Sequence, residues 1–386
     1  MLHLKTLTLR RAAYALGMAS LLAALGACSS NKDHRRDPTP LTTFKPVLEV
    51  KQAWKASVGK SGHFLFQPAV VNGFVYAAGQ NGTVAKFDAT TGHVIWRSKM
   101  SSDLSAGVGT DGTLTAVGSL DGTLFVLDNN GKLSWKVNVS GEILSPPLIG
   151  NGMVIVRTID GRVTAFDAQT GEQKWVFLNR SVPLNLRTTM GLTFAGTNAV
   201  LAGFPGGSVA AISVANGDTF WQSAVSYPQG VTEVERINDV SGTPQLVGRL
   251  ACAGTYQGKI GCFDVESGRA VWEQAFSTYN GVSEDERQVV AADDWSVVKA
   301  YDANTGKPLW ENTFLKNRNL NRPVLLGQVV AVGDYQGFVH FLSASTGEFI
   351  ARMKTDGHAI VAPAVVAGQS LVVQTSDGDL YAFQPQ

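Results

Sequence analysis

Cysteine and histidine are scarce in this 386-residue sequence, which has three cysteines and six histidines. The histidines are scattered singly and none lies at metal-ligand spacing from a cysteine, so the sequence predicts no metal site. It also has no Gly-x-Ser-x-Gly, phosphate loop or dinucleotide fingerprint in a strand–turn–helix setting. These absences predict a protein that is not an enzyme and that needs no cofactor.

Charged residues and long apolar runs are also limited. Charged residues make up 16% of the chain, and the formal net charge is +1. Without a leader that contains Lys5, Arg10 and Arg11, the chain has 29 basic and 31 acidic residues, a net charge of −2. Such a balance indicates no nucleic-acid partner. Beyond the leader, no apolar run approaches the roughly 20 residues of a membrane-spanning helix.

What the sequence does contain is one phrase repeated eight times, at a spacing of about forty residues. In its fullest form it reads Asp-Ala-x-Thr-Gly-x-x-x-Trp and follows a short apolar strand. The copies are marked by a turn residue, a residue that ends the strand, and a later tryptophan: Gly82, Asp88, Trp96; Gly122, Asp128, Trp135; Gly161, Asp167, Trp175; Gly207, Ser213, Trp221; Gly258, Asp264, Trp272; Ser296, Asp302, Trp310; and a degenerate Gly337, Ser343, Ala351. The eighth copy is split, with Gly378 and Gln384 at the C-terminus and Trp54 near the other end.

A last repeat that is completed by the first strand indicates a closed ring, because a circular array pairs its own ends. We therefore expect an all-β fold, an eight-bladed β-propeller with four antiparallel strands per blade, closed by the strand near Trp54. In one unit the expected strands are 68–71, 74–78, 83–88 and 94–97. Asn-Gly and Asp-Gly pairs supply the hairpin turns. The tryptophans are expected to fill the wedges between blades and not to form a binding cage.

The N-terminus has the pattern of a secretion signal that ends at a cysteine. A basic stretch precedes an apolar segment, 12–25, and then Leu25-Gly26-Ala27-Cys28. This pattern resembles that of bacterial lipoprotein precursors, and it implies a signal peptide at 1–27 and a lipidated Cys28. Ser29 in the next position implies the periplasmic face of the outer membrane. Residues 28–46 are polar and proline-containing, which predicts a flexible tether, with the propeller spanning 47–386.

The two remaining cysteines, Cys252 and Cys262, are predicted on the second and third strands of one blade. Paired strands can bring them opposite one another, and an oxidising compartment favours a disulfide. Two small buried thiols are the alternative.

The connections between blades differ in length. Most span about ten to fourteen residues, whereas the one from Trp221 to Pro244 exceeds twenty, and the preceding one carries the apolar stretch 182–187. Both are expected on the same face of the ring, on neighbouring blades. Leucines beside an arginine in such loops are typical of a protein-binding hot spot. The alternative is that Leu184 and Leu186 tuck under the loop as an extra strand.

The repeat resembles the tryptophan-docking repeat of quinoprotein dehydrogenases, propellers whose central channel holds pyrroloquinoline quinone (PQQ). That resemblance makes a PQQ-dependent periplasmic enzyme one alternative. Those enzymes are much longer and typically have a vicinal Cys-Cys pair and calcium ligands at the cofactor, whereas this chain has no adjacent cysteines. A glycan-binding propeller is a second alternative, but it would need an aromatic-lined groove, which the sequence does not reveal.

Together, the lipoprotein signal, tether, eight repeats and Pro-Leu-x-Leu-Arg loop resemble the BamB family, lipoprotein subunits of the outer-membrane β-barrel assembly (BAM) machinery. The resemblance covers essentially the whole chain. It implies a non-enzymatic scaffold that binds the POTRA domains of BamA through Leu184, Leu186, Arg187 and Asp239. The family often has a second acidic residue two places later, where this chain has Ser241. Unfolded outer-membrane proteins are a further hypothetical partner, guided along exposed blade edges by strand addition.

Overall fold

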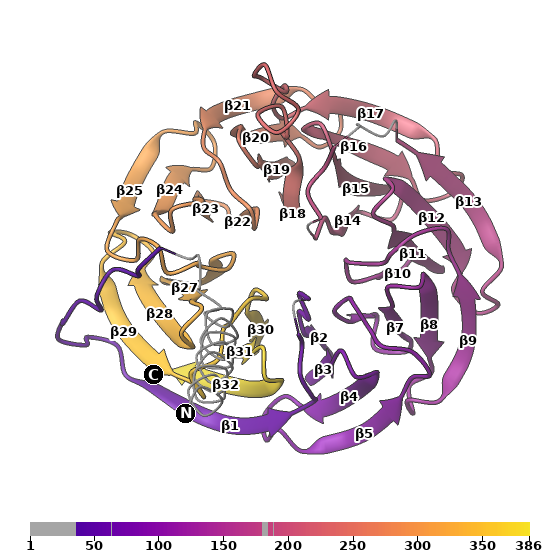
Figure 1. Cartoon of the computed structure of the whole chain (residues 1–386), viewed down its shortest axis with the longest axis horizontal. Helices are drawn as coiled ribbons and strands as arrows, with labels where there is room; N and C mark the ends of the chain where they lie inside the picture. The colour runs from indigo at the N-terminus through magenta and orange to yellow at the C-terminus, as the bar shows by residue number, and fades with distance from the viewer. Residues whose placement is uncertain (1–35, 63, 180–183, 188) are drawn as a thin grey trace, which may run out of the picture. The chain divides into compact units, whose positions relative to one another are not determined.

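The computed structural model describes residues 36–62, 64–179, 184–187 and 189–386. Within them, Pro38–Gln386 forms one compact unit made of eight four-stranded antiparallel sheets (Figure 1). The sheets follow one another around a ring as the blades of a propeller, with their first strands near the axis and their last strands at the rim (Figure 1). The predicted all-β, eight-bladed propeller is confirmed. No described helix has the length and apolar composition that crossing a membrane requires.

Each blade is built from four strands that run in order from the axis to the rim. Blades 1 to 4 are β2 Ala69–Val71, β3 Phe74–Ala78, β4 Thr83–Asp88, β5 Val94–Lys99; β6 Gly109–Thr110, β7 Thr115–Gly118, β8 Thr123–Leu127, β9 Leu133–Asn138; β10 Leu148–Gly150, β11 Met153–Arg157, β12 Arg162–Asp167, β13 Gln173–Leu178; and β14 Leu192–Ala195, β15 Ala199–Phe204, β16 Ser208–Ser213, β17 Thr219–Ala224. Blades 5 to 8 are β18 Val240–Val247, β19 Leu250–Thr255, β20 Lys259–Asp264, β21 Ala270–Ala275; β22 Val282–Glu284, β23 Gln288–Ala292, β24 Val298–Asp302, β25 Pro308–Asn312; β26 Val324–Leu326, β27 Val329–Gly333, β28 Phe338–Ser343, β29 Phe349–Lys354; and β30 Val365–Ala367, β31 Ser370–Gln374, β32 Asp379–Pro385, β1 Val50–Ser57.

Blade 8 closes the ring with strands from both ends of the chain. Its order is β30-β31-β32-β1, and β1 pairs antiparallel with β32 so that Trp54 lies opposite Ala382. The split eighth repeat therefore forms one sheet, as the sequence predicted. This pairing closes the ring, so the array of blades has no free end.

The repeat tryptophans join each blade to the next. In seven of the eight joints the indole N–H of one blade donates to the carbonyl that follows the third strand of the next blade: Trp54 to Ala89, Trp96 to Asn129, Trp135 to Ala168, Trp175 to Val214, Trp221 to Val265, Trp272 to Ala303 and Trp310 to Ala344. The glycine of the Asp-Ala-x-Thr-Gly phrase has a positive φ and lies against the indole ring of the preceding blade. At Gly306 (φ 67°), an added Cβ would come within 2.6 Å of the Trp272 ring, so this repeat position has no room for a side chain.

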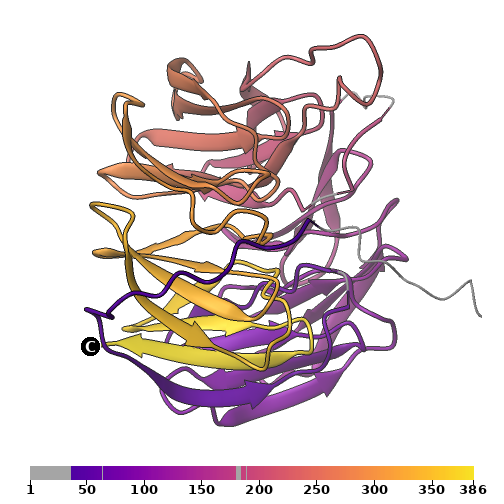
Figure 2. The same ribbon diagram turned by 60° about the vertical axis from the view of Figure 1, so that its left-hand side comes forward.

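The joint between blades 7 and 8 has Ala351 in the tryptophan position, and the N-terminal segment lies there instead. Val47 and Leu48 donate their backbone N–H groups to the carbonyl of Ile350, and Phe44 stacks on Phe349 with ring centroids 5.3 Å apart. Figure 2 shows this indigo segment running along the blade that contains β29. Within the segment 28–46 that the sequence assigns to a flexible tether, Thr39, Thr42 and Phe44 contact the propeller.

Two arginines of blade 7 hold this segment by its backbone. Arg318 donates to the carbonyl of Thr39 at 2.9 Å, and Arg352 donates to the carbonyl of Thr42 at 3.0 Å. Arg318 is itself buried and paired with Asp334, whose carboxylate lies 2.7 Å from its Nε. Polar and proline-rich composition predicted a tether here, but it could not show that distant guanidinium groups donate hydrogen bonds to its carbonyls.

Candidate partner-binding surface

Two connections between blades lie side by side on one face of the ring. The first links β13 to β14, and the second, 225–239, links β17 to β18. The N–H of Leu186 in the first connection donates to the carboxylate of Asp239 in the second at 2.5 Å, and Met190 of the first forms a parallel bridge with Gly242 of the adjoining β18. The sequence-based expectation that these loops form one contiguous surface is confirmed, although residues 180–183 and 188 of the first connection lie outside the described residues.

The two leucines of the first connection differ in exposure. Leu184 is 42% exposed, whereas Leu186 is partly buried. Neither belongs to a strand in this structure, so the alternative of an extra strand beneath the loop is not what the structure shows. Leu184 therefore offers an apolar side chain to a partner, whereas the side chain of Leu186 is directed partly into the protein.

Arg187 is held in place by a carboxylate from another blade. Its Nε and Nη2 both donate to one oxygen of Glu142, at 2.9 and 2.8 Å. The Arg187 side chain remains 55% exposed, and no described residue accepts a hydrogen bond from its Nη1. Glu142 thus fixes the direction of the guanidinium while one edge stays open to solvent. No sequence pattern pointed to Glu142, which is 45 positions away in the connection between blades 2 and 3.

Asp239 is completely buried, so its carboxylate does not reach the surface. One oxygen accepts the N–H of Leu186 at 2.5 Å, and the other accepts the N–H of Gly206 at 3.0 Å. Burial raises the pKa of Asp239, while these two hydrogen bonds and the charge of Arg157 act in the opposite direction. The acidic residue implied by the family resemblance therefore holds the Leu186 loop from inside.

Ser241, where the family often has a second acid, is also buried. Its hydroxyl donates to the carbonyl of Thr278 at 2.6 Å. The departure from the family pattern thus falls at an interior position, and it removes no charge from the surface of this chain.

The second connection adds exposed apolar side chains that the sequence reasoning missed. Tyr227, Val231 and Val234 are 73%, 95% and 62% exposed. The turn that presents them is capped by Glu235, whose carboxylate accepts the N–H groups of Val231 and Thr232. Apolar residues spaced through a long connection were the available signal. Exposed apolar side chains in a long connection are typical of protein-binding sites.

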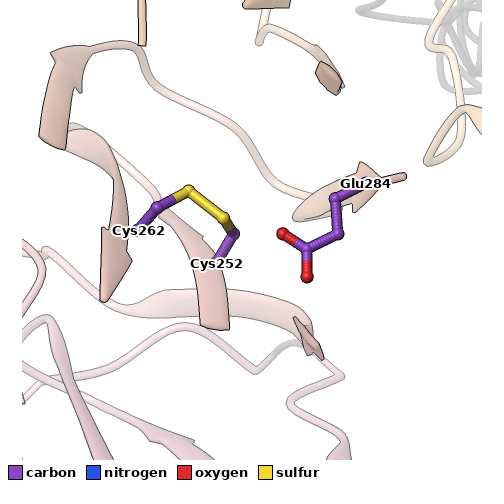
Figure 3. Close-up of side chains that lie close together, drawn as sticks. All are labelled: Cys252, Cys262 and Glu284. Carbon is purple, nitrogen blue, oxygen red and sulfur yellow. A yellow bond between two sulfur atoms is a disulfide. The ribbon is translucent and has the colours of Figure 1, made fainter. Parts of the chain in front are cut away.

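The structure joins Cys252 and Cys262 by a disulfide across β19 and β20 (Figure 3). Of the two alternatives that the sequence left open, the bridge is the one observed. Glu284 of β22 points toward it (Figure 3), and these three residues are the only group of potential metal ligands found within the described ranges. Because both sulfur atoms are used in the disulfide, the group has no thiolate to offer a metal ion.

Glu284 is an unusual carboxyl group for a blade interior. Both of its oxygens are buried and neither has a hydrogen-bond partner. Burial raises the pKa of Glu284 to about 8, and the backbone of Val247, which lies near the carboxyl group without forming a hydrogen bond to it, offsets only part of that effect. The group is therefore mostly protonated at neutral pH, because the apolar surroundings disfavour its charged form.

The fold and the surface together define a class of protein: a binding propeller built from quinoprotein-type repeats, whose docked tryptophans serve packing. A quinohemoprotein alcohol dehydrogenase from Comamonas testosteroni has a similar fold, with a TM-score of 0.71 and 16% identity over 90% of this chain and 78% of that chain. The crystal structure of BamB from Moraxella catarrhalis gives a TM-score of 0.81 and 27% identity, over 87% of this chain and 100% of that chain.

Sequence comparisons give the family. The model described as "Outer membrane protein assembly factor BamB" matches residues 80–297 and 294–386. Relatives with that name from Burkholderia pseudomallei and Bordetella pertussis are 60% and 42% identical, covering 98% and 93% of this chain and 99% and 94% of their own lengths. The chain belongs to the BamB family of outer membrane protein assembly factors. It is accordingly an assembly factor and not an enzyme.

Proposed function

We propose that this chain is a scaffold subunit of the BAM complex that binds the POTRA domains of BamA through the surface formed by the two connections. The family assignment supports a role in outer-membrane protein assembly. The single observation that carries the site is the exposed Leu184 beside Arg187, on a loop fixed by Glu142 and Asp239. A rigid apolar anchor next to an oriented guanidinium is typical of an interface hot spot.

These side chains have different roles in the proposed contact. Leu184 packs into an apolar depression of BamA, together with apolar residues of the second connection. Arg187 donates from its open edge to a carboxylate or carbonyl of the partner, while Glu142 holds its other edge. Because the guanidinium is already oriented, binding costs less side-chain entropy than it would for a free arginine.

We further propose that a lipid chain on Cys28 anchors the protein to the periplasmic face of the outer membrane. Cys28 and the signal peptide lie outside the described residues, and the proposal rests on the sequence pattern and on the named family. Several acyl chains on one cysteine give stable anchoring, whereas one chain gives only marginal binding. Anchoring confines the encounter with BamA to the membrane surface and raises the effective concentration of both proteins.

Replacement of Leu184 by aspartate tests the contact. Leu184→Asp is expected to weaken binding to the purified periplasmic region of BamA by at least about tenfold, or about 1.4 kcal/mol. The reason is that a charge replaces an apolar side chain that the proposed complex buries. Isothermal titration calorimetry measures the affinity. Leu309→Asp, in an outer strand where Leu309 is 51% exposed, is the matched control and should bind as the wild type does. Equal affinities for all three proteins would refute the proposed site.

Asp239 should act on binding through the loop and not through contact. Asp239→Asn replaces one acceptor oxygen by an N–H₂ group that faces a backbone donor, so one of the two hydrogen bonds is lost. We expect affinity for BamA to fall several-fold, by about 1 kcal/mol, with a smaller loss than for Leu184→Asp. Asp218→Asn, at an exposed position, is the control. Wild-type affinity in Asp239→Asn would show that this carboxylate does not position the surface.

A further inference from the structure

A cavity of about 310 Å³ is lined by inner strands and by the segments that lead into them. A narrower recess lies beside it, and Gln67, Thr243 and Arg322 line both spaces. The recess is also lined by Thr189 of the first connection and by Gly242 of β18, whose N–H donates to the Thr189 carbonyl. The cavity has the size of a small-ligand site.

Among the described residues, Arg322 is the only charged one that lines either space. Its Nη1 donates to the hydroxyl of Ser283 at 3.1 Å and, more weakly, to the carbonyl of Val282 at 3.4 Å. In the described part of the chain no carboxylate pairs with it. Burial lowers the pKa of Arg322 to about 10, and the guanidinium still stays charged at neutral pH.

The one acidic residue on the neighbouring strand does not neutralise this charge. Glu284 points toward the disulfide, and its carboxyl group is mostly protonated (Figure 3). Removing a cation from water without a counter-charge is costly, so a positive charge left unpaired in a cavity favours an anion there. Two more donors are available, because the side chains of Gln67 and Thr243 hydrogen-bond no residue that the structure describes.

We propose that this cavity is a carboxylate-binding site, in which Arg322 pairs with a single carboxylate while Gln67 and Thr243 donate hydrogen bonds to it. An arginine can bind a carboxylate through two parallel N–H···O bonds. One positive charge matches a carboxylate better than it matches a phosphate group, which carries nearly two negative charges at neutral pH. A free small carboxylic acid and the C-terminus of a peptide both carry this group.

Calorimetric titration of the full-length lipoprotein in detergent tests the site. The probes are benzoate, trialanine with a free C-terminal carboxylate, and the same peptide with an amidated C-terminus. Saturable binding of benzoate identifies a small acid as a sufficient ligand, and binding of the peptide acid but not of benzoate identifies a chain terminus. Either result supports the site, provided that the amide binds at least about tenfold more weakly than the acid.

Two variants assign the binding to the guanidinium. Arg322→Gln is expected to reduce affinity for the carboxylate at least about tenfold. Arg322→Lys keeps the charge but not the bidentate geometry, so its affinity should lie between those of the wild type and Arg322→Gln. Unchanged circular dichroism and BamA binding would show that both variants fold. The proposal is overturned if neither acid binds saturably, if acid and amide bind equally, or if a folded Arg322→Gln binds as the wild type does.

Discussion

Glu284→Gln is expected to stabilise the protein, and the gain should grow with pH. Burial raises the pKa of Glu284 from 4.5 to about 8, so the folded state holds a proton that the unfolded state releases between these values. Stability therefore falls as pH rises through this window, by about 1.4 kcal/mol per pH unit and by roughly 5 kcal/mol in all. Glutamine cannot ionise and escapes this loss.

Denaturant unfolding at about pH 5 and about pH 8 measures the effect. The two proteins should be nearly equal at the lower pH, whereas the glutamine variant should be more stable by roughly 4 kcal/mol at the higher pH. Glu286→Gln, at an exposed position two residues away, is the matched control and should change little. A gain that is the same at both pH values would mean that Glu284 is ionised in the folded state throughout this range.

Trp272→Ala is expected to lower the free energy of unfolding by about 4 kcal/mol, near the upper end for a single core truncation. The indole is 8% exposed between blades 5 and 6, and its N–H donates to the carbonyl of Ala303 at 2.6 Å. Its removal leaves a cavity against Gly306 and an unpaired carbonyl. Because the ring depends on every joint, the loss should lower the midpoint of the whole transition.

The same denaturant unfolding measurement includes Phe220→Ala as control. Phe220 is an aromatic residue of an outer strand but is 60% exposed, so its truncation should cost less than about 1 kcal/mol. If the two variants lost equal stability, the tryptophans would not be the joints between blades.

The fold was predictable because several independent features of the repeat indicate the same architecture. Turn glycines, short apolar strands and one tryptophan per unit recur together, so the repeats support the same architecture, and Trp54 indicated how the ring closes. The contacts of the N-terminal segment with Arg318 and Arg352 were not predicted, because they join positions some 300 residues apart.

The surface was predictable only where a short linear motif carries it. Leu184 and Arg187 were found from the motif and from unequal loop lengths, and the structure places both at the surface. The family resemblance implied that Asp239 contacts the partner. No sequence pattern shows whether an acidic side chain in a loop faces inward. Glu142 and Arg322 escaped notice because their roles come from the ring, which brings separate blades together.

Capture of BamA by the tagged protein from solubilised outer membranes tests the central claim most directly. Wild type, Arg187→Ala and Leu309→Asp are compared, and the captured proteins are identified by mass spectrometry. The proposed function predicts BamA with the wild type and with Leu309→Asp, and its loss with Arg187→Ala. Recovery of BamA with Arg187→Ala at the wild-type level, or its absence from the wild-type capture, would contradict it.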